Sequence, residues 1–452
     1  MAGNQNQTGE QSVNETERYL ELTPKSRAIW EEAKNYLPGG DSRNSIFWEP
    51  YPFFVESSSG CHVIDADGVD RVDFINTMTT MILGHAPKVV MQAVEEQLAK
   101  GVAYNAPNEH QVRLAKILCQ RIPSFDLLRF TNSGTEATLN TLRAARAFTG
   151  KSRFAKAEGG YHGTHDSVTV SLRVNPDQAG DADRPNALPS SAGLPDGVVE
   201  QVLIIPFNDT QASLKLLEEN KDELAAVIVE PVLGSVGMVP ATPDFLAMLR
   251  EFTQANGIIL IFDEVISFRV APGGSQQYYG ITPDMTALGK IIGGGFAVGA
   301  FGGRRDIMEQ YDPTTPDGPS VSHAGTFNAN PVTMVAGATT LEQLTPDVYR
   351  RLAELTEELR KGLRDACAEL EVPVQVTGLG SLFGIHFTDG EIRGYRDVAA
   401  GNNALRHQMF LGLMNEGFLT ASNLVGSLST EMAEPEIDAF VDAFKKVLAR
   451  QL

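Results

Sequence analysis

The sequence has little cysteine and none of the short motifs that mark the common zinc and nucleotide sites. Its 452 residues include three cysteines, Cys61, Cys119 and Cys367, which lie far apart and form no CxxC pair. Zinc sites and disulfide frameworks need regularly spaced cysteines, so neither is expected, and a reducing cytoplasm is the compartment that fits. No GxxxxGK[ST] segment occurs, which excludes a P-loop nucleotide site.

Long apolar runs and an excess of positive charge are also absent. No run of about 18 apolar residues is present, so no membrane span is predicted. The polar start lacks the basic and apolar regions of a signal peptide and is expected to be a frayed arm. Acidic residues outnumber basic ones by 57 to 37, for a formal net charge of −20. This charge argues against nucleic-acid or anionic-membrane partners, but a local cation can still hold a small anionic substrate.

The sequence does contain a regular alternation of strand-like and helix-like segments. Continuous apolar runs rich in β-branched residues are typical of strands buried on both faces, and they occur at residues 224–232 and 258–265, while residues 127–130 and 153–158 are also strand-like. Amphipathic helices are predicted between them at 134–150 and 243–257. This order predicts an α/β fold with a mainly parallel sheet covered on both sides.

The pattern divides the chain into three parts. Residues 1–84 are interpreted as an N-terminal arm with a segment of a small domain, 85–332 as a large domain, and 333–452 as the rest of a smaller α+β domain. A helix is expected at 25–38, short strands within 53–74, and a final helix at 434–452. The stretch from Asn175 to Gly197, rich in Pro, Gly, Asp and Ala, is predicted to be a long functional loop.

Lys290 is the first candidate for chemistry, because its neighbours do not suit a solvated lysine. It is the only cation between Ala287 and Gly303, in "ALGKIIGGGFAVGAFGG". Small, apolar and flexible neighbours favour a partly desolvated amine that acts as a base or a nucleophile. The alternative is a lysine whose stem lies along an apolar surface while its charge reaches water.

Three further candidates follow strands, where ligands bind in open α/β sheets. Asp263 ends an apolar run, and a buried carboxylate there can hold a proton on a ring nitrogen, although a capping role is the alternative. Ser133, Gly134 and Thr135 open a helix and suit a phosphate, with a plain N-cap as the alternative. In "GGYHGTHD", Tyr161 can lie flat over a ligand. The neighbouring histidines invite a metal interpretation, but they lack a third ligand, so no metal is predicted.

Six segments in order resemble the class III aminotransferases, a fold-type-I family that uses pyridoxal 5′-phosphate (PLP). They are "SGTEA", "GGYHG", "VEPV", "IFDEV", "LGKIIGGG" and "HAGTFNANP", and the resemblance covers about residues 30 to 445. It implies a large domain with a mainly parallel seven-stranded sheet, a smaller α+β domain, and PLP as the cofactor.

The same resemblance implies roles for individual residues. Lys290 forms the internal Schiff base, Asp263 holds the pyridine nitrogen protonated, and Tyr161 stacks on one face of the ring; these three are the expected catalytic residues. The remaining cofactor contacts are expected from Ser133, Gly134, Thr135, His162, Glu230, Val265 and Thr326. Of these, Val265 packs on the second ring face. Thr326 reaches the phosphate of the neighbouring subunit, which implies a homodimer with shared active sites.

Two groups within the family differ at the substrate end. Glutamate-1-semialdehyde aminomutases carry an arginine where this chain has Ile46 and a glutamate where it has Val425. "PGGDSRNS" instead resembles the β-phenylalanine aminotransferases, which implies that Arg43 receives a substrate carboxylate as a bidentate fork. The second arginine of those relatives falls on Asn423, so binding of a keto-acid carboxylate is in doubt and the pocket is open to bulky amines.

The departures at Ile46 and Val425 favour an aminotransferase over the aminomutase, and the cysteine content favours the cytoplasm. The enzyme is expected to move an amino group between a β-amino acid or primary amine and a keto acid or aldehyde, by a ping-pong ketimine mechanism. The alternative is glutamate-1-semialdehyde 2,1-aminomutase, an isomerase with the same cofactor. A cofactor-binding protein without catalysis is disfavoured, because Lys290, Asp263 and Tyr161 are all present.

Overall fold

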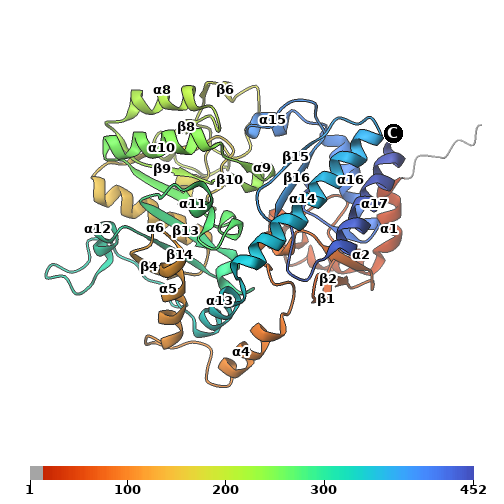
Figure 1. Cartoon of the computed structure of the whole chain (residues 1–452), viewed down its shortest axis with the longest axis horizontal. Coiled ribbons are helices and arrows are strands. Elements are labelled where there is room, and N and C mark those ends of the chain that lie inside the picture. The colour runs from red at the N-terminus through yellow and green to blue at the C-terminus, as the bar shows by residue number, and fades with distance from the viewer. Residues whose placement is uncertain (1–13) are drawn as a thin grey trace, which may run out of the picture.

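The computed structural model describes residues 14–452. Most of the polar arm predicted at the N-terminus lies outside this range. Its last residues are helical rather than frayed, because the Asn14 side chain accepts hydrogen bonds from the Thr16 and Glu17 amides and caps helix α1 (Glu15–Leu22). Figure 1 shows two lobes, one with α8, α10 and α6 around a sheet and one with α1, α14, α16 and α17.

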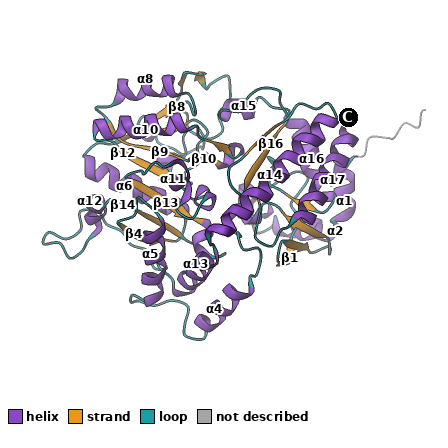
Figure 2. Cartoon of the chain, viewed as in Figure 1, coloured by secondary structure: helices purple, strands orange, loops and turns teal. Residues whose placement is uncertain are grey.

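A seven-stranded sheet forms the centre of the larger lobe (Figure 2). Its strands, in spatial order, are β4 (Leu127–Thr131), β14 (Gly299–Gly303), β13 (Met285–Gly289), β12 (Ile259–Asp263), β9 (Leu224–Val229), β5 (Arg153–Ala157) and β8 (Val202–Ile205). Only β14 runs antiparallel to its two neighbours. The predicted mainly parallel sheet is therefore confirmed, and β14, a glycine-rich segment without strand signals, was not predicted.

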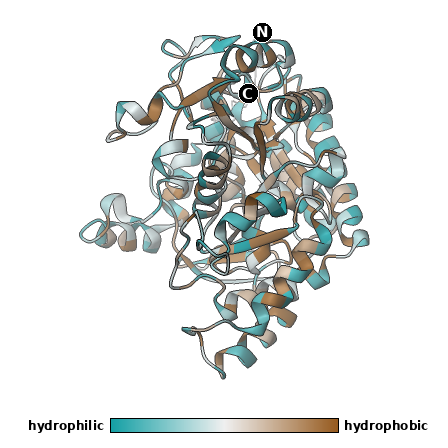
Figure 3. Cartoon of the chain, turned by 90° about the vertical axis from the view of Figure 1, so that its left-hand side faces the viewer, coloured by the Kyte–Doolittle hydropathy of each residue, from teal (hydrophilic) through white to brown (hydrophobic). Residues whose placement is uncertain are grey.

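Helices cover both faces of this sheet, as the unbroken apolar runs predict. Every residue of β9 and β12 is buried. Alternate residues point to opposite sides: Val227 packs in the cluster with α8 and α10, and Ile228 packs in the cluster with α6. In Figure 3 the brown strands lie inside and the outer helix faces are teal.

Several helices of this lobe, among them α6, α10 and α13, begin at a side-chain cap, and the last two also have a proline in the first turn. Their bounds are α4 (Lys88–Leu98), α5 (Glu109–Arg121), α6 (Gly134–Thr149), α8 (Thr210–Asn220), α10 (Pro243–Asn256), α11 (Gly274–Tyr279), α12 (Arg305–Met308) and α13 (Pro331–Gln343). The predicted loop at 175–197 contains two very short strands, β6 (Gly180–Asp181) and β7 (Arg184–Pro185), and ends at α7 (Asp196–Val199).

The smaller lobe combines both ends of the chain. A four-stranded sheet joins β1 (Val55–Ser59), β2 (His62–Asp65) and β3 (Asp70–Asp73) to β17 (Phe418–Leu419), and a three-stranded sheet joins β15 (Gln375–Thr377), β16 (Leu382–His386) and β18 (Val425–Ser427). Its helices are α2 (Pro24–Ala33), α14 (Pro346–Glu369), α15 (Tyr395–Ala399), α16 (Asn403–Asn415) and α17 (Glu434–Gln451). Helix α2 ends at Ala33, so the helix predicted up to Pro38 is too long; the proline begins a separate 3₁₀ turn.

The structure also bears on the predictions about cysteines and membrane spans. All three cysteines are unpaired, and Cys61 and Cys367 are buried. Across residues 14–452, no helix combines the length and the apolar character needed to cross a bilayer. The domain boundaries at residues 84 and 332 stay predictions.

Candidate active site

A cavity of ≈ 330 Å³ opens where several strands of the large sheet end at the same edge. Polar groups follow the ends of β4, β5, β9, β12 and β13, which all run in the same direction. The cavity is lined by Thr77, Thr80, Asn132, Gly134, Thr135, Tyr161, His162, Gly163, Glu230, Asp263, Val265, Ile266, Lys290, Gly295, Phe296, Ala297 and Val298. The volume lies in the range of small-molecule sites.

Lys290 faces this cavity directly after β13. It has a φ of 52°, an uncommon left-handed conformation for a residue with a side chain and a form of strain that concentrates at functional sites. Its Nζ makes no hydrogen bond with residues 14–452. Burial lowers the pKa of Lys290, and the nearby carboxyls of Asp263 and Glu230 only partly oppose this effect. The lysine therefore becomes a neutral amine more readily than a surface lysine.

Asp263 ends β12 inside the cavity and is 4% exposed. Its Oδ2 lies 2.9 Å from His162 Nδ1, and its Oδ1 accepts a hydrogen bond from the Val265 amide at 3.1 Å. Burial lowers the pKa of His162, although Asp263 opposes the shift. The imidazole is therefore neutral at pH 7, and its Nδ1–H donates to the Asp263 carboxylate.

Glu230 is a second buried carboxyl, immediately after β9. It accepts hydrogen bonds from the Tyr161 amide at 2.8 Å and from the Gly234 amide at 3.2 Å. Burial raises its pKa, and the charge of Asp263 adds to the shift. Two carboxyls that share a site do not both ionise easily, so Glu230 takes up a proton more readily than a solvent-exposed glutamate does.

The N-terminus of α6 forms the anion-binding end of the cavity. Gly134 and Thr135 line it, and the first amides of a helix have no partner within the helix. Ser133 is not a lining residue: its hydroxyl accepts a hydrogen bond from the Glu136 amide at 3.1 Å. The capping alternative therefore describes Ser133, while Gly134 and Thr135 occupy the place predicted for a phosphate.

Besides Ser133, two further predicted residues lie outside the cavity lining. Arg43 is exposed, before a 3₁₀ turn at Asn44–Ile46. Thr326 is exposed in the loop before α13. Tyr161 and Val265 do line the cavity, and Tyr161 is 40% exposed. His165 is not a lining residue, and within residues 14–452 no group of three or more His, Cys, Asp or Glu side chains suits a metal ion.

Sequence reasoning missed part of the lining. Asn132 and Phe296 lie next to predicted motifs, so widening each motif by a few residues would have included them. Thr77 and Thr80 gave no signal, because they come from the N-terminal part of the chain and reach the cavity only through the tertiary fold.

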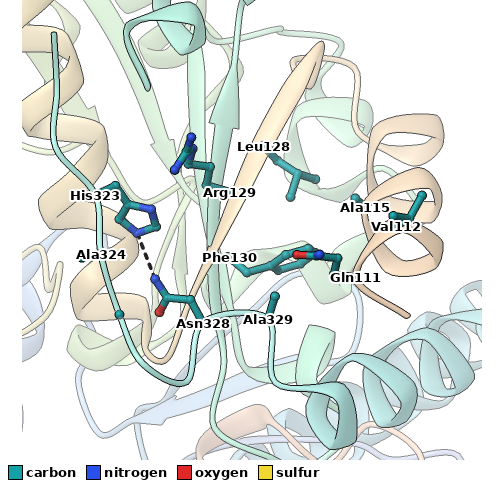
Figure 4. A pocket seen from close by; sticks show the side chains of 11 residues that line it. Gln111, Val112, Ala115, Leu128, Arg129, Phe130, His323, Ala324, Asn328 and Ala329 are labelled. Carbon is teal, nitrogen blue, oxygen red and sulfur yellow. Dashed lines mark hydrogen bonds between the residues drawn. The ribbon is translucent and has the colours of Figure 1, made fainter. Parts of the chain in front are cut away.

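A second cavity of ≈ 550 Å³ borders the loop of Thr326 (Figure 4). Its walls come from α5, β4 and residues 323–329. His323 Nε2 and Asn328 Nδ2 are 3.4 Å apart across the loop, and Phe130 and Ala329 add apolar surface. None of its lining residues is shared with the Lys290 cavity.

Comparison with known proteins identifies the family. The model of the family "Aminotransferase class-III" matches residues 47–448. The chain belongs to the class III aminotransferases. The resemblance predicted from the six segments is thereby confirmed, as is the fold.

Individual class III relatives carry different activities in their names. A glutamate-1-semialdehyde 2,1-aminomutase from Methanothermobacter thermautotrophicus is 41% identical over 432 residues, or 94% of this chain and 99% of the relative. The crystal structure of an omega-transaminase from Sphaerobacter thermophilus is 46% identical with a TM-score of 0.91, covering 94% of this chain and 97% of that one. A β-phenylalanine aminotransferase from Variovorax paradoxus is 38% identical with a TM-score of 0.87, covering 96% of each chain.

Class III enzymes use PLP, and a solved transaminase with PLP bound is 38% identical to this chain, with a TM-score of 0.88 over 95% of this chain and 98% of that one. The residues present fit the cofactor. Within the described part of the chain, His162 Nε2 is buried without a partner, Lys290 Nζ makes no hydrogen bond, and the Asp263 carboxylate meets no arginine. The space is also kept open: a Cβ on Gly163 would lie 2.6 Å from Thr135 Oγ1, and one on Gly134 would lie 3.0 Å from both Val265 methyl groups.

Proposed function

We propose that this class III enzyme is a PLP-dependent aminotransferase that moves an amino group between a β-amino acid or primary amine and a keto acid or aldehyde. The observation that carries the proposal is the site around Lys290. A desolvated amine with no hydrogen bond shares one cavity with a buried carboxylate and a free helix N-terminus.

When bound there, PLP supplies an electron sink for the carbon that carries the amino group. The residues of the chain then have separate tasks. Lys290 Nζ would hold the aldehyde carbon of the cofactor and, as a free amine after the substrate amine has replaced it, would accept the proton from the substrate carbon that carries the amino group. The Asp263 carboxylate keeps a proton on the pyridine nitrogen, and Gly134 and Thr135 bind the phosphate with their amides and the Thr135 hydroxyl. Tyr161 and Val265 enclose the ring from its two faces.

The substrate end of the cavity offers no second cation to a substrate carboxylate. Among the lining residues Lys290 is the only cation, and Ile266 and Phe296 are apolar. Asn423, where β-phenylalanine aminotransferases carry their second arginine, uses its amide to donate to the Ser235 carbonyl at 3.2 Å. Arg43 as the receiver of a carboxylate stays a prediction.

The aminomutase is the second candidate, and the names of the curated relatives favour it over transamination. Its substrate, glutamate-1-semialdehyde, also carries a carboxylate. Against it stand Ile46 and Val425, where aminomutases carry an arginine and a glutamate, and the higher identity to the omega-transaminase. A cytoplasmic location fits three unpaired cysteines and is part of the proposal.

We also propose a homodimer in which Thr326 completes the site of the partner. Thr326 is exposed and does not line the cavity of its own chain, which suits a residue that serves another subunit. Apolar side chains around it are exposed as well: Phe327 at 59%, Val112 at 64% and Val102 at 55%. Burying such a group against a second copy is favourable.

One experiment separates these activities. The purified holoenzyme is mixed with β-phenylalanine, 1-phenylethylamine or glutamate-1-semialdehyde, and the absorbance of the bound cofactor is followed. Transamination predicts a lasting spectral change with the first two, reversed by a keto acid. Isomerisation predicts turnover of the semialdehyde alone, without an added acceptor. Lys290→Ala removes the covalent link in either case, and Lys361→Ala, at an exposed lysine of α14, leaves it intact.

A further inference from the structure

Four consecutive residues near the cavity adopt a left-handed conformation although none is a glycine. Asn76, Thr77, Met78 and Thr79 have φ values of 51°, 53°, 52° and 72°. The Thr79 amide donates to the Ile75 carbonyl at 2.7 Å, and the Thr80 amide to the Asn76 carbonyl at 2.8 Å, so the segment closes as one turn. L-residues adopt this conformation at a cost and normally singly. A run of four is therefore strained backbone that its surroundings must hold.

Hydrogen bonds from buried groups hold both ends of this left-handed turn. Asp73 Oδ1 accepts from the Ile75 amide at 2.9 Å and from the Asn76 amide at 2.8 Å. Asn76 Nδ2 donates to the carbonyl of Ser427 in β18 at 2.6 Å. The turn is thus tied to a strand that lies far away in the sequence.

Arg269 ties the same turn to the segment that follows Asp263. It is 1% exposed and has no carboxylate partner. Its Nη1 donates to the Thr79 carbonyl and to Ser427 Oγ, both at 2.8 Å, and its Nε donates to Ser381 Oγ at 2.8 Å. Burying a guanidinium without a carboxylate costs free energy unless its hydrogen-bond acceptors stay in place. The arginine therefore holds the turn in a fixed position relative to the Lys290 cavity.

The turn brings two threonine side chains to the cavity. Thr77 and Thr80 both line it, and neither hydroxyl forms a hydrogen bond with another side chain or with the backbone of residues 14–452. The free hydroxyls are therefore available to a ligand. Because Lys290 is the only cation in the lining and is committed to the cofactor, a substrate anion must be bound by neutral donors, and the two threonine hydroxyls, like that of Tyr161, are such donors.

We propose that the left-handed turn is a specificity element: Thr77 and Thr80 donate hydrogen bonds to the carboxylate of an amino-acid substrate, and Arg269 is the residue that positions them. This inference rests on the proposed amino transfer. Hydrogen-bond donors on a backbone that is already fixed lose little conformational entropy when a ligand binds. Hydrogen bonds to a charged acceptor are the stronger kind.

The test compares two substrates that differ at the carboxylate. β-Phenylalanine and 1-phenylethylamine share the phenyl-bearing carbon and the amine, but only the first carries a carboxylate. Thr77→Val and Thr80→Val keep the shape and remove the hydroxyl. Each is expected to raise the KM for β-phenylalanine about tenfold, with kcat unchanged, and to leave the kinetics with 1-phenylethylamine within about twofold.

Each result has a distinct meaning. Equal losses with both substrates, or no change with β-phenylalanine, overturn the inference. A carboxylate-selective loss in Arg43→Ala, with none in the threonine variants, overturns it as well and assigns the carboxylate to Arg43. If the wild-type enzyme converts neither amine, the proposed function itself fails.

A second measurement needs no cofactor. Thr77→Gly relieves left-handed strain and is expected to raise the urea midpoint of the apoprotein. The same is expected of the control variant Glu371→Gly, at an exposed residue with a φ of 55° in the small lobe. Only Thr77→Gly is expected to raise the KM for β-phenylalanine. A lower midpoint in Thr77→Gly shows that the turn is not strained.

The positioning role of Arg269 is tested with the same two substrates. Arg269→Lys offers one nitrogen to several acceptors and is expected to raise the KM for β-phenylalanine selectively, as the threonine variants do. Ser381→Ala is expected to have a smaller effect of the same kind.

Discussion

His162 and Asp263 form a buried pair in which the imidazole Nδ1 lies 2.9 Å from the carboxylate Oδ2. Because burial lowers the pKa of the histidine, it donates as a neutral group and does not cancel the charge of the aspartate. The other carboxylate oxygen accepts only a backbone amide. The pair therefore orients the Asp263 carboxyl group towards the cavity, as its proposed contact with a protonated ring nitrogen needs.

Replacing Asp263 by asparagine tests that charge. Asp263→Asn keeps the volume and a hydrogen bond to His162 but cannot stabilise a pyridinium. We expect kcat for amine conversion to fall by about 10²- to 10³-fold, while the protein still binds PLP. The measurement is single-turnover absorbance of the bound cofactor with 1-phenylethylamine.

Glu264→Gln is the matched control, because Glu264 is the next residue and is equally buried. Its carboxylate accepts hydrogen bonds from Ser275 and Gln276 and does not line the cavity. Activity per folded molecule is expected to persist in this variant. Equal losses in both variants would assign the effect to general disruption of the strand end.

Gly163 keeps the anion end of the cavity open, and a methyl group there tests this role. It has a φ of 102°, and a Cβ would lie 2.7 Å from the Thr135 Cα. Gly163→Ala is expected to weaken PLP binding at least about tenfold, because Thr135 must move away. Gly150 has a φ of 69° but no heavy atom within 4 Å of such a Cβ. Gly150→Ala should cost about 1 kcal/mol of stability and leave PLP affinity unchanged. Fluorescence titration of the apoproteins with PLP gives both affinities.

The sequence predicted the parts of the site that depend on strand ends. The apolar parts of the runs 224–232 and 258–265 indicate strands buried on both faces. The first acidic residue of each run, Glu230 and Asp263, lies at the same sheet edge in the structure. The antiparallel strand β14 was missed because its residues are mostly glycine, which carries no strand signal.

The rest of the site depends on contacts between distant segments. Thr77 and Thr80 reach the cavity through a turn held by Arg269 and Ser427, and no local pattern encodes such a connection. The conformation of that turn was also unpredictable, since positive φ is normally signalled by glycine. Arg43, which was predicted from resemblance alone, lies on the surface.

The burial of Lys156 predicts that the free energy of unfolding depends on pH, independently of catalysis. It is fully buried on β5, and its Nζ donates to the Val170 carbonyl at 2.7 Å. Burial lowers its pKa to about 7 from 10.5, with Glu230 and Glu158 opposing the shift. Below about pH 7 the lysine is protonated in both the folded and the unfolded state, so the folded state bears the full free-energy cost of burying its charge. Between about pH 7 and 10.5 only the unfolded lysine stays protonated, so stability rises with pH.

Lys156→Met removes this penalty. In urea unfolding of the apoprotein, the variant is expected to be more stable than the wild type at about pH 6.5, and the difference should shrink towards about pH 10. Each unit of pKa shift corresponds to about 1.4 kcal/mol. A difference that stays constant over this pH range would show that Lys156 is not desolvated in the folded protein.

The exposed loop at Thr326 and Phe327 predicts how the active site is shared. Phe327→Glu places a charge on an apolar surface that a second copy would bury, and it is expected to shift the protein to a monomer in sedimentation and to abolish turnover. Tyr278→Glu changes an aromatic residue that is 56% exposed on α11 and should leave both properties unchanged.

Mixing two inactive variants, Lys290→Ala and Thr326→Ala, tests the sharing of the active site more directly. Lys290→Ala has no usable lysine, and Thr326→Ala is expected to bind PLP weakly. A mixed dimer combines Lys290 of one chain with Thr326 of the other and restores one complete site. Recovery of about a quarter of the wild-type activity per subunit, the share from random exchange, is therefore expected. No recovery, from a mixture whose exchange is verified by mass, would place Thr326 outside the partner's site.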